Sequence, residues 1–134
     1  MATIIHGGGA VIDGRAWLDL MIGQKIIASN SAGNTSALTV VGIIDFSEVS
    51  KITVKLTNGA SRTDWGDATL WTGASIANGK ITGHSGSTAV VHSSSNQVFD
   101  LTKLAKEDLK SCAFSCSSTS SGSNYTELQF ISYE

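Results

Sequence analysis

The fold of this chain is decided by one stretch of its sequence, IIDFSEVSKITVKLT, which runs from Ile43 to Thr57. In the second half of the stretch Ile52, Val54 and Leu56 point to one side, and the Thr and Lys residues between them point to the other. Such alternation of β-branched and polar residues is typical of a strand with one dry face and one wet face. The first half ends a strand at Asp-Phe-Ser, a corner that short polar side chains stabilise by bonding nearby backbone N–H groups. We therefore expect the other strands of the chain to cover the dry face of this one.

The composition indicates one globular domain. The chain has 134 residues, of which 41% are hydrophobic and only 15% are charged. That is enough apolar material for a single core, and Ser, Thr, Gly and Asn make up most of the rest. A net charge of −2 without a basic cluster argues against a nucleic-acid partner. There is no apolar run of about 18 residues and no leader pattern, so we expect no membrane insertion and a chain that is made in the cytoplasm, unless a leader has been removed.

Short alternating runs separated by turn signals recur along the chain and predict eight to ten strands. The one helical candidate is Thr102–Leu109, a two-turn segment with Thr102 as a possible N-cap. This pattern is typical of an all-β, antiparallel β-sandwich with one short helical turn. An internal echo favours the jelly-roll form of sandwich. Ile44–Val49 and Phe99–Leu104 share the order apolar, Asp, apolar, hydroxyl, charged, apolar, which suits two crossovers at the same end of the sandwich.

The two cysteines are predicted to be free thiols. Cys112 and Cys116 lie four residues apart in a segment that alternates like a strand, with Phe114 between them. Four extended residues span about 13 Å, which exceeds the roughly 7 Å between Cα atoms that a disulfide can bridge. Both thiols should face the core on the same side as Phe114.

Residues 1–9 are predicted to form an N-terminal arm with a glycine hinge, and residues 10–134 the sandwich domain. Ile4 and Ile5 make the arm apolar enough to pair as a strand, while Gly7–Gly9 detaches it from the body. We expect the arm to pack on a neighbouring subunit or on a carrier protein.

The segment Ala16–Ile22 is predicted to be a strand as well. Its alternation places Leu18, Leu20 and Ile22 inward. Trp17 and Met21 would then point outward, where they would join Ile4 and Ile5 in an assembly contact.

A candidate ligand-binding segment lies between residues 62 and 71, in the least regular part of the chain. Sugar sites combine an aromatic platform with planar polar side chains that bond hydroxyl groups. The alternative is that both tryptophans plug the open end of the sandwich. The residues predicted to bind ligand are Arg62, Asp64, Trp65, Asp67 and Trp71.

No catalytic, metal or cofactor motif stands out. The sequence has no G-x-S-x-G elbow, and His6, His84 and His92 show no metal-ligand spacing. Asp64 and Asp67 are interpreted as turn residues around Gly66 rather than as a catalytic pair. We therefore expect no enzymatic activity, no metal and no cofactor.

The pieces IIDFSEVSKITVKLT and FDLTKLAKEDLKSCAFSCSS…YTELQFISYE resemble the galactose-binding-like jelly-roll domains, in which strands often follow an Asp-apolar-Ser/Thr corner. The resemblance covers Leu38 to Tyr133. It implies a jelly roll of the kind found in carbohydrate-binding modules and in small modules of phage tail fibres, baseplates and head decorations. The chain lacks a clear acidic cluster for calcium, so the structural calcium of some such domains is not expected here.

Two functions are compatible with this resemblance. The first is a non-enzymatic structural or binding module of a phage or phage-like particle, located in the virion and contacting host surface glycans. Its partners would be itself, as a homo-oligomer such as a trimer, or other virion proteins. The alternative is a carbohydrate-binding module of a glycan-degrading system, located outside the cell. A chain that starts at Met and ends on a strand, with an arm for assembly, favours the first.

Overall fold

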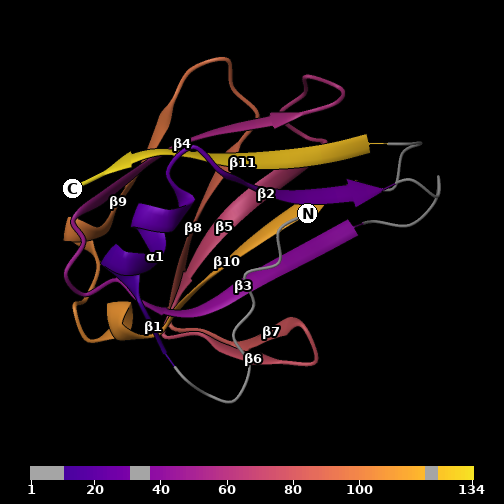
Figure 1. The fold of residues 1–134 in the computed structure, drawn as a ribbon. Coiled ribbons are helices and arrows are strands. Elements are labelled where there is room, and N and C mark those ends of the chain that lie inside the picture. Colours follow the sequence, from indigo (N-terminus) through magenta and orange to yellow (C-terminus); the bar gives the residue numbers. More distant parts are fainter. Residues whose placement is uncertain (1–10, 31–36, 120–123) are drawn as a thin grey trace.

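The alternating segments of the sequence become the strands of two facing sheets in a computed structural model, which describes residues 11–30, 37–119 and 124–134 (Figure 1). Over these residues there are eleven strands, one α-helix and two 3₁₀ turns. In chain order they are β1 Ile12–Asp13, α1 Gly14–Met21, β2 Lys25–Asn30, β3 Ala37–Asp45, β4 Lys51–Asn58, β5 Gly66–Thr72, β6 Ser75–Ala77, β7 Lys80–Gly83, β8 Gly86–Val91, β9 Gln97–Asp100, η1 Leu101–Lys103, η2 Asp108–Lys110, β10 Cys112–Ser118 and β11 Asn124–Tyr133.

The strands pair in a nested order, like a long hairpin that has been rolled up. β2 pairs with β11, β3 with β10, β4 with β9, β5 with β8 and β6 with β7, all antiparallel. Two further pairings, β10 with β5 and β11 with β4, join the first four of these pairs into sheets of order β1-β3-β10-β5-β8 and β2-β11-β4-β9, whereas β6 and β7 form a two-stranded sheet of their own. β1 is the exception, since it adds to β3 in parallel. This is the predicted jelly roll. The strand count exceeds eight to ten because of the very short β1 and β6.

The core lies between the two sheets and is filled by the predicted inward faces. Ile52, Val54 and Leu56 of β4 are fully buried, and Leu128 and Phe130 of β11 lie opposite Leu56 and Val54. On the facing sheet the inward residues of β10 include both cysteines, which are buried free thiols as predicted. Aromatic rings meet at the centre, with ring centroids 5.2–6.1 Å apart in pairs drawn from Trp17, Phe46, Phe99, Phe114 and Phe130.

The prediction of a strand at Ala16–Ile22 is wrong, because residues 16–21 belong to helix α1 and Ile22 is its C-cap. The buried residues of α1 are Gly14, Trp17, Leu18 and Met21, a spacing of three, four and seven that defines one face of a helix. Trp17 and Met21 therefore lie in the core rather than outside.

The residues that take their place outside are Leu20, which is 72% exposed, and Ile22. The predicted assembly contact thus loses both of its outward side chains. Its other two residues, Ile4 and Ile5, and the arm at residues 1–9 lie outside the described residues.

The helix predicted at Thr102–Leu109 is replaced by the two 3₁₀ turns η1 and η2. Asp100, not Thr102, caps the first turn, and its Oδ1 accepts the backbone N–H of Thr102 at 3.1 Å. The echoing corner at Asp45 has the same geometry, since Asp45 Oδ1 accepts the N–H of Ser47 at 2.8 Å. The internal echo of the sequence is thus a repeated corner in the fold. Among the described residues no helix is long and apolar enough to cross a membrane.

Candidate functional site

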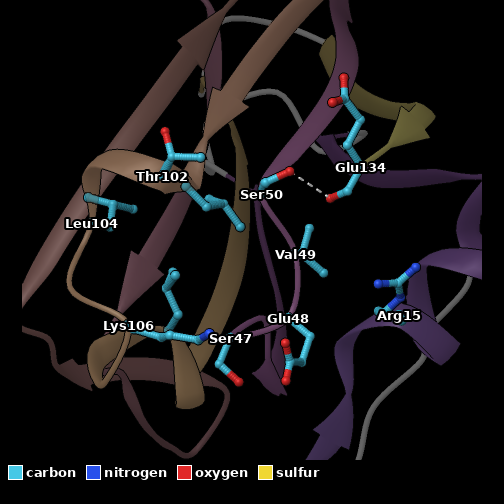
Figure 2. Close-up of a pocket in the computed structure, with 11 residues that line it drawn as sticks. Arg15, Ser47, Glu48, Val49, Ser50, Thr102, Leu104, Lys106 and Glu134 are labelled. Carbon is cyan, nitrogen blue, oxygen red and sulfur yellow. Dashed lines mark hydrogen bonds between the residues drawn. The ribbon is translucent and has the colours of Figure 1, made fainter.

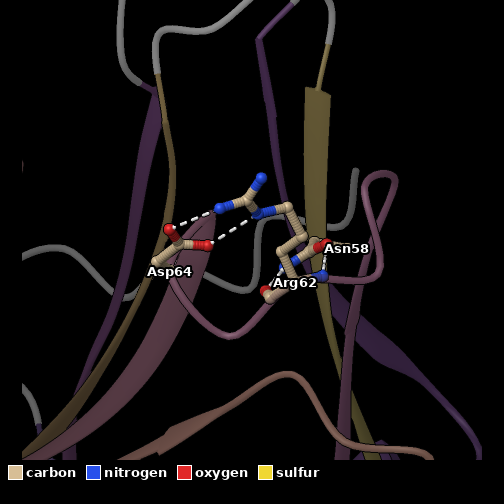
Figure 3. A network of polar contacts seen from close by, with 3 residues as sticks. All are labelled: Asn58, Arg62 and Asp64. Atoms are coloured by element: carbon tan, nitrogen blue, oxygen red, sulfur yellow. Dashed lines mark hydrogen bonds and ion pairs between the residues drawn. The ribbon is translucent and has the colours of Figure 1, made fainter.

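The loop between β4 and β5 is organised by Asn58, the last residue of β4. Its side chain is only 4% exposed, and its Oδ1 accepts the N–H groups of Ala60 and Arg62, both at 3.1 Å. Its Nδ2 donates to the carbonyl of Arg62 at 2.6 Å (Figure 3). One buried amide therefore holds the backbone of the loop from both sides, so the side chains that the loop carries start from a fixed frame.

Arg62 and Asp64 form a two-pronged ion pair at the surface. Nε and Nη2 of Arg62 donate to the two carboxylate oxygens of Asp64, each at 3.0 Å (Figure 3). The hydrogen bond between them raises the pKa of the Arg62 guanidinium and lowers the pKa of the Asp64 carboxyl. The guanidinium also lies over the ring of Trp65, 5.3 Å from its centroid. Both charged side chains are more than half exposed, at 57% and 61%, so the pair orients planar polar groups more than it stabilises the fold.

Gly66 allows the chain to pass directly against β10 and β11. Its φ is +152°, and a Cβ at this position would overlap the Thr126 hydroxyl and come within 2.7 Å of the Ser117 carbonyl oxygen. Glycine alone adopts this positive φ readily and leaves room for the neighbouring atoms, because it has no Cβ. The close approach begins β5 and brings the residues around Gly66 next to the end of β10, where Ser117 lies opposite Asp67 and Ser118 opposite Gly66.

A hollow of about 290 Å³ opens at this junction. Asp67 Oδ1 accepts the hydroxyl of Ser117 at 2.8 Å. Ser118 is 2% exposed, and its Oγ has no hydrogen-bond partner among the described residues. A buried hydroxyl of this kind normally finds a partner, but it lies on the inward face of β10, opposite the face that carries the Ser117 hydroxyl. The hollow is lined by Thr63, Asp64, Gly66, Asp67, Ser117, Ser118 and Thr119.

Four of the five predicted ligand-binding residues therefore come together at this end of the sandwich, and the fifth does not. Trp71 lies six residues beyond Trp65 along an extended strand, roughly 20 Å away. Its Nε1 donates to Ser115 Oγ at 2.8 Å, and its ring lies 4.6 Å from that of His84. It lines a separate hollow of about 310 Å³ with Leu38, Val40, Lys80, Ile81, His84 and Ser115. Neither Trp65 nor Trp71 belongs to the buried core.

Sequence reasoning missed Ser117 and Ser118. The alternation of β10 does contain a signal for the latter, because the inward series Cys112, Phe114, Cys116 continues to Ser118. A polar residue at the last inward position of a strand indicates an opening at the end of the core. What the sequence does not reveal is the register that sets these serines beside Asp67 and Gly66.

A larger hollow, of about 460 Å³, lies at the other end of the sandwich (Figure 2). Both echoing corners line it, through Ser47–Ser50 on one side and Thr102 and Leu104 on the other. Val49, Leu101 and Leu109 form an apolar floor. Arg15 approaches from α1, across the hollow from Thr102 and Leu104 (Figure 2).

The charged groups of this second hollow form no ion pair among the described residues, although the Arg15 guanidinium lies over the ring of Tyr133, 5.8 Å from its centroid. The ion pairs of the described residues are Lys25–Glu127, Arg62–Asp64 and Lys110–Glu107, none of which belongs to it. The hollow thus combines two cations, Arg15 and Lys106, with two carboxylates, Glu48 and Glu134. This mixture suits several classes of polar ligand and singles out none.

The described residues offer neither an ionised thiol nor a cluster of metal ligands. Burial raises the pKa of Cys112 and of Cys116 to about 12, so both are protonated thiols at neutral pH. Over residues 11–30, 37–119 and 124–134 there is no group of three or more His, Cys, Asp or Glu side chains placed to hold a metal ion. Comparison with family models, with curated proteins and with solved structures found no match for this chain.

Proposed function

We propose that this chain is a non-enzymatic binding and structural module of a phage or phage-like particle, and that it contacts glycans on the host surface. The jelly-roll architecture supports the proposal, because it agrees with the resemblance to galactose-binding-like domains in the sequence. The binding end is the loop between β4 and β5 together with the end of β10. The location that follows is the virion, as a tail-fibre, baseplate or capsid-decoration component.

One observation carries the glycan part of the proposal. The rigid loop presents Arg62, Asp64 and Trp65 beside a hollow that contains the Asp67 carboxylate and the Ser117 hydroxyl. Sugar hydroxyl groups both donate and accept hydrogen bonds, so they match a mixture of carboxylates, a planar guanidinium and hydroxyls. A loop that is already fixed by Asn58 also reduces the entropy lost when a ligand is ordered on it.

Self-association is the second part of the proposal. Ile4 and Ile5 are apolar residues that would pack on a second subunit or on another virion protein, and a homo-oligomer such as a trimer would result. Because Trp17 and Met21 are in the core, any apolar contact beside the arm has to come from exposed residues such as Leu20.

A glycan array together with a native mass measurement tests the proposal. We expect binding of at least one glycan and a mass of two or more chains of 13.9 kDa each. Trp65→Ala should abolish the binding, whereas the matched control Trp71→Ala should leave it unchanged, because Trp71 lies in a different hollow. An array without any bound glycan contradicts the glycan part. A glycan-binding monomer instead supports the alternative, a carbohydrate-binding module of a glycan-degrading system.

A further inference from the structure

We infer that the hollow of about 310 Å³ beside Trp71 binds small organic carboxylates whose acidic group is carried on a flat apolar ring. This hollow lies on the outer face of the larger sheet, where the β6–β7 hairpin reaches β3 (Figure 1). It is separate from the glycan site proposed at the loop between β4 and β5. The inference therefore goes beyond the proposed function and does not depend on it.

The floor of the hollow is built by three neighbouring strands of the larger sheet. Leu38 and Val40 come from β3, Ser115 from β10 and Trp71 from β5. Ser115 points away from the core, because Phe114 beside it in the strand points into the core. Leu38 is 53% exposed, so part of this apolar floor is open to a ligand.

The wall of the hollow is the segment that contains the β6–β7 hairpin, and both ends of this segment are fixed. At its start the N–H of Ala74 donates to the carbonyl oxygen of Ser111 at 2.8 Å, and Ser111 Oγ donates to the carbonyl oxygen of Ala74 at 2.7 Å. At its end the N–H of Ser85 donates to the carbonyl oxygen of Thr72 at 2.8 Å. A wall that is held in place before binding reduces the entropy lost when a ligand is ordered against it.

Trp71 gives the hollow a fixed aromatic surface. Its Nε1 donates to Ser115 Oγ at 2.8 Å, and its ring centroid lies 4.6 Å from that of His84. The hydrogen bond holds the indole by its polar edge, which leaves apolar parts of the ring to pack against a ligand. Since Ile81 adds an aliphatic side chain from the hairpin, the hollow matches a ligand with a flat apolar ring.

The polar groups of the hollow are hydrogen-bond donors. Lys80 lines it and takes part in none of the ion pairs of the described residues. Ser115 is 8% exposed, and its Oγ accepts from Trp71, but its own O–H has no acceptor over residues 11–30, 37–119 and 124–134. None of the described residues that line the hollow is acidic. An ammonium group and a buried hydroxyl donor favour a ligand that carries a negative charge and accepts hydrogen bonds.

A carboxylate on an apolar ring meets both requirements, since the ring packs on Trp71 while the carboxylate accepts from Ser115 and pairs with Lys80. The hollow at the end of the sandwich that contains Arg15 does not match such a ligand. Its described lining has no aromatic residue, and it includes the carboxylates of Glu48 and Glu134.

The experiment compares two probes that share a ring and differ in charge, naphthoate and the matching naphthamide. Each is titrated into the isotope-labelled full chain at neutral pH, and the indole N–H signals of its three tryptophans are followed by NMR. We expect the signal of Trp71 to shift and those of Trp17 and Trp65 to stay in place. Naphthoate should bind at least roughly fivefold more tightly than naphthamide, because only naphthoate can pair with Lys80.

Four variants assign the contacts. Lys80→Gln should lower the affinity for naphthoate to that for naphthamide, whereas Lys51→Gln, which removes an exposed lysine of the opposite sheet, should leave both affinities unchanged. Trp71→Ala should abolish the binding of both probes, followed through the backbone signal of Ile81, whereas Trp65→Ala should not affect it. Melting temperatures close to that of the wild type show that each variant is folded.

The results that would overturn the inference are distinct from those that bear on the glycan site. Equal affinities for the two probes, or an unchanged affinity for naphthoate in Lys80→Gln, would show that the hollow does not recognise the charge. A shift of the Trp65 signal in place of the Trp71 signal, or no shift over the soluble range of the probes, would show that the hollow is not the site. Each of these leaves the glycan proposal standing, because that proposal depends on Trp65 and is tested on the array.

Discussion

The two core thiols should make the folded state less stable at alkaline pH. Burial raises the pKa of Cys112 and Cys116 from 9.0 to about 12. In the unfolded chain both thiols titrate near their ordinary value, whereas in the folded chain they keep their protons. Below about pH 9 both states are protonated, and the thiols add no pH dependence to the free energy of unfolding.

Above that pH the unfolded state loses protons that the folded state retains, so the folded state becomes less stable as the pH rises. The loss is roughly 1.4 kcal/mol per thiol for each pH unit, and it continues until the folded thiols titrate near pH 12. At pH 10 the two thiols together should cost roughly 3 kcal/mol, a large share of the roughly 5–15 kcal/mol that stabilises a typical domain.

Urea unfolding at pH 8, 9 and 10 measures this loss, with the double variant Cys112→Ala, Cys116→Ala as the control. The contribution of every other group is common to both proteins. The wild type should lose roughly 3 kcal/mol more than the variant between pH 8 and pH 10. Equal pH dependence in the two proteins would refute the reasoning, because it would mean that the thiols are solvated and ionise in the folded state.

Further substitutions test the corners, the close approach and the core. Asp45→Ala removes the acceptor for the Ser47 N–H and should lower the free energy of unfolding by roughly 0.5–1.5 kcal/mol in urea titrations. The hydrogen bond from Thr102 lowers the pKa of Asp100. This carboxylate therefore stabilises the fold at pH values above its ordinary pKa of 3.8, and the stabilisation is lost as the pH falls through the lower pKa of the folded state. The melting temperature of Asp100→Ala should accordingly fall less on acidification than that of the wild type. Gly66→Ala should cost roughly 2–5 kcal/mol, and a smaller loss in thermal unfolding would mean that the β5–β10 junction can move apart. Leu56→Ala should cost roughly 2–5 kcal/mol, and a loss near zero would contradict its place in the core.

The strands were predictable because a two-layer sandwich imposes the same rule on every strand. Residues on one face of β4, β10 and β11 must be apolar, and the alternation of Ile52, Val54 and Leu56 with Thr and Lys in β4 follows from that rule. Helix α1 was not predicted because its sequence fits both the alternation of a strand and the periodicity of a helix. Leu18, Leu20 and Ile22 alternate like a strand, but Trp17, Leu18 and Met21 with Gly14 form a helical face, and the helical face contains the larger side chains to bury.

The sequence predicts one part of the candidate site and not the other. Residues 62–67 come together because they are neighbours in one loop, which sequence proximity predicts. Trp71 is separated from them because β5 is extended, and a strand carries residues apart by more than 3 Å each. The serines at the end of β10 join the site through strand register, and register depends on pairings between residues about fifty positions apart.

The nested pairing explains why both hollows are built from remote segments. Since β3 pairs with β10 and β4 with β9, the crossover from β3 to β4 has to run beside the crossover from β9 to β10. The corners at Asp45 and Asp100 open these two crossovers, so their similar sequences meet at the hollow that contains Arg15. The same argument places the loop after β4 beside the loop after β8, and the hydrogen bond of 3.3 Å from the backbone N–H of Asn58 to His92 Nδ1 joins them there. A jelly roll thus gathers its crossovers in pairs at its two ends, and a ligand at either end is held by segments that only the topology brings together.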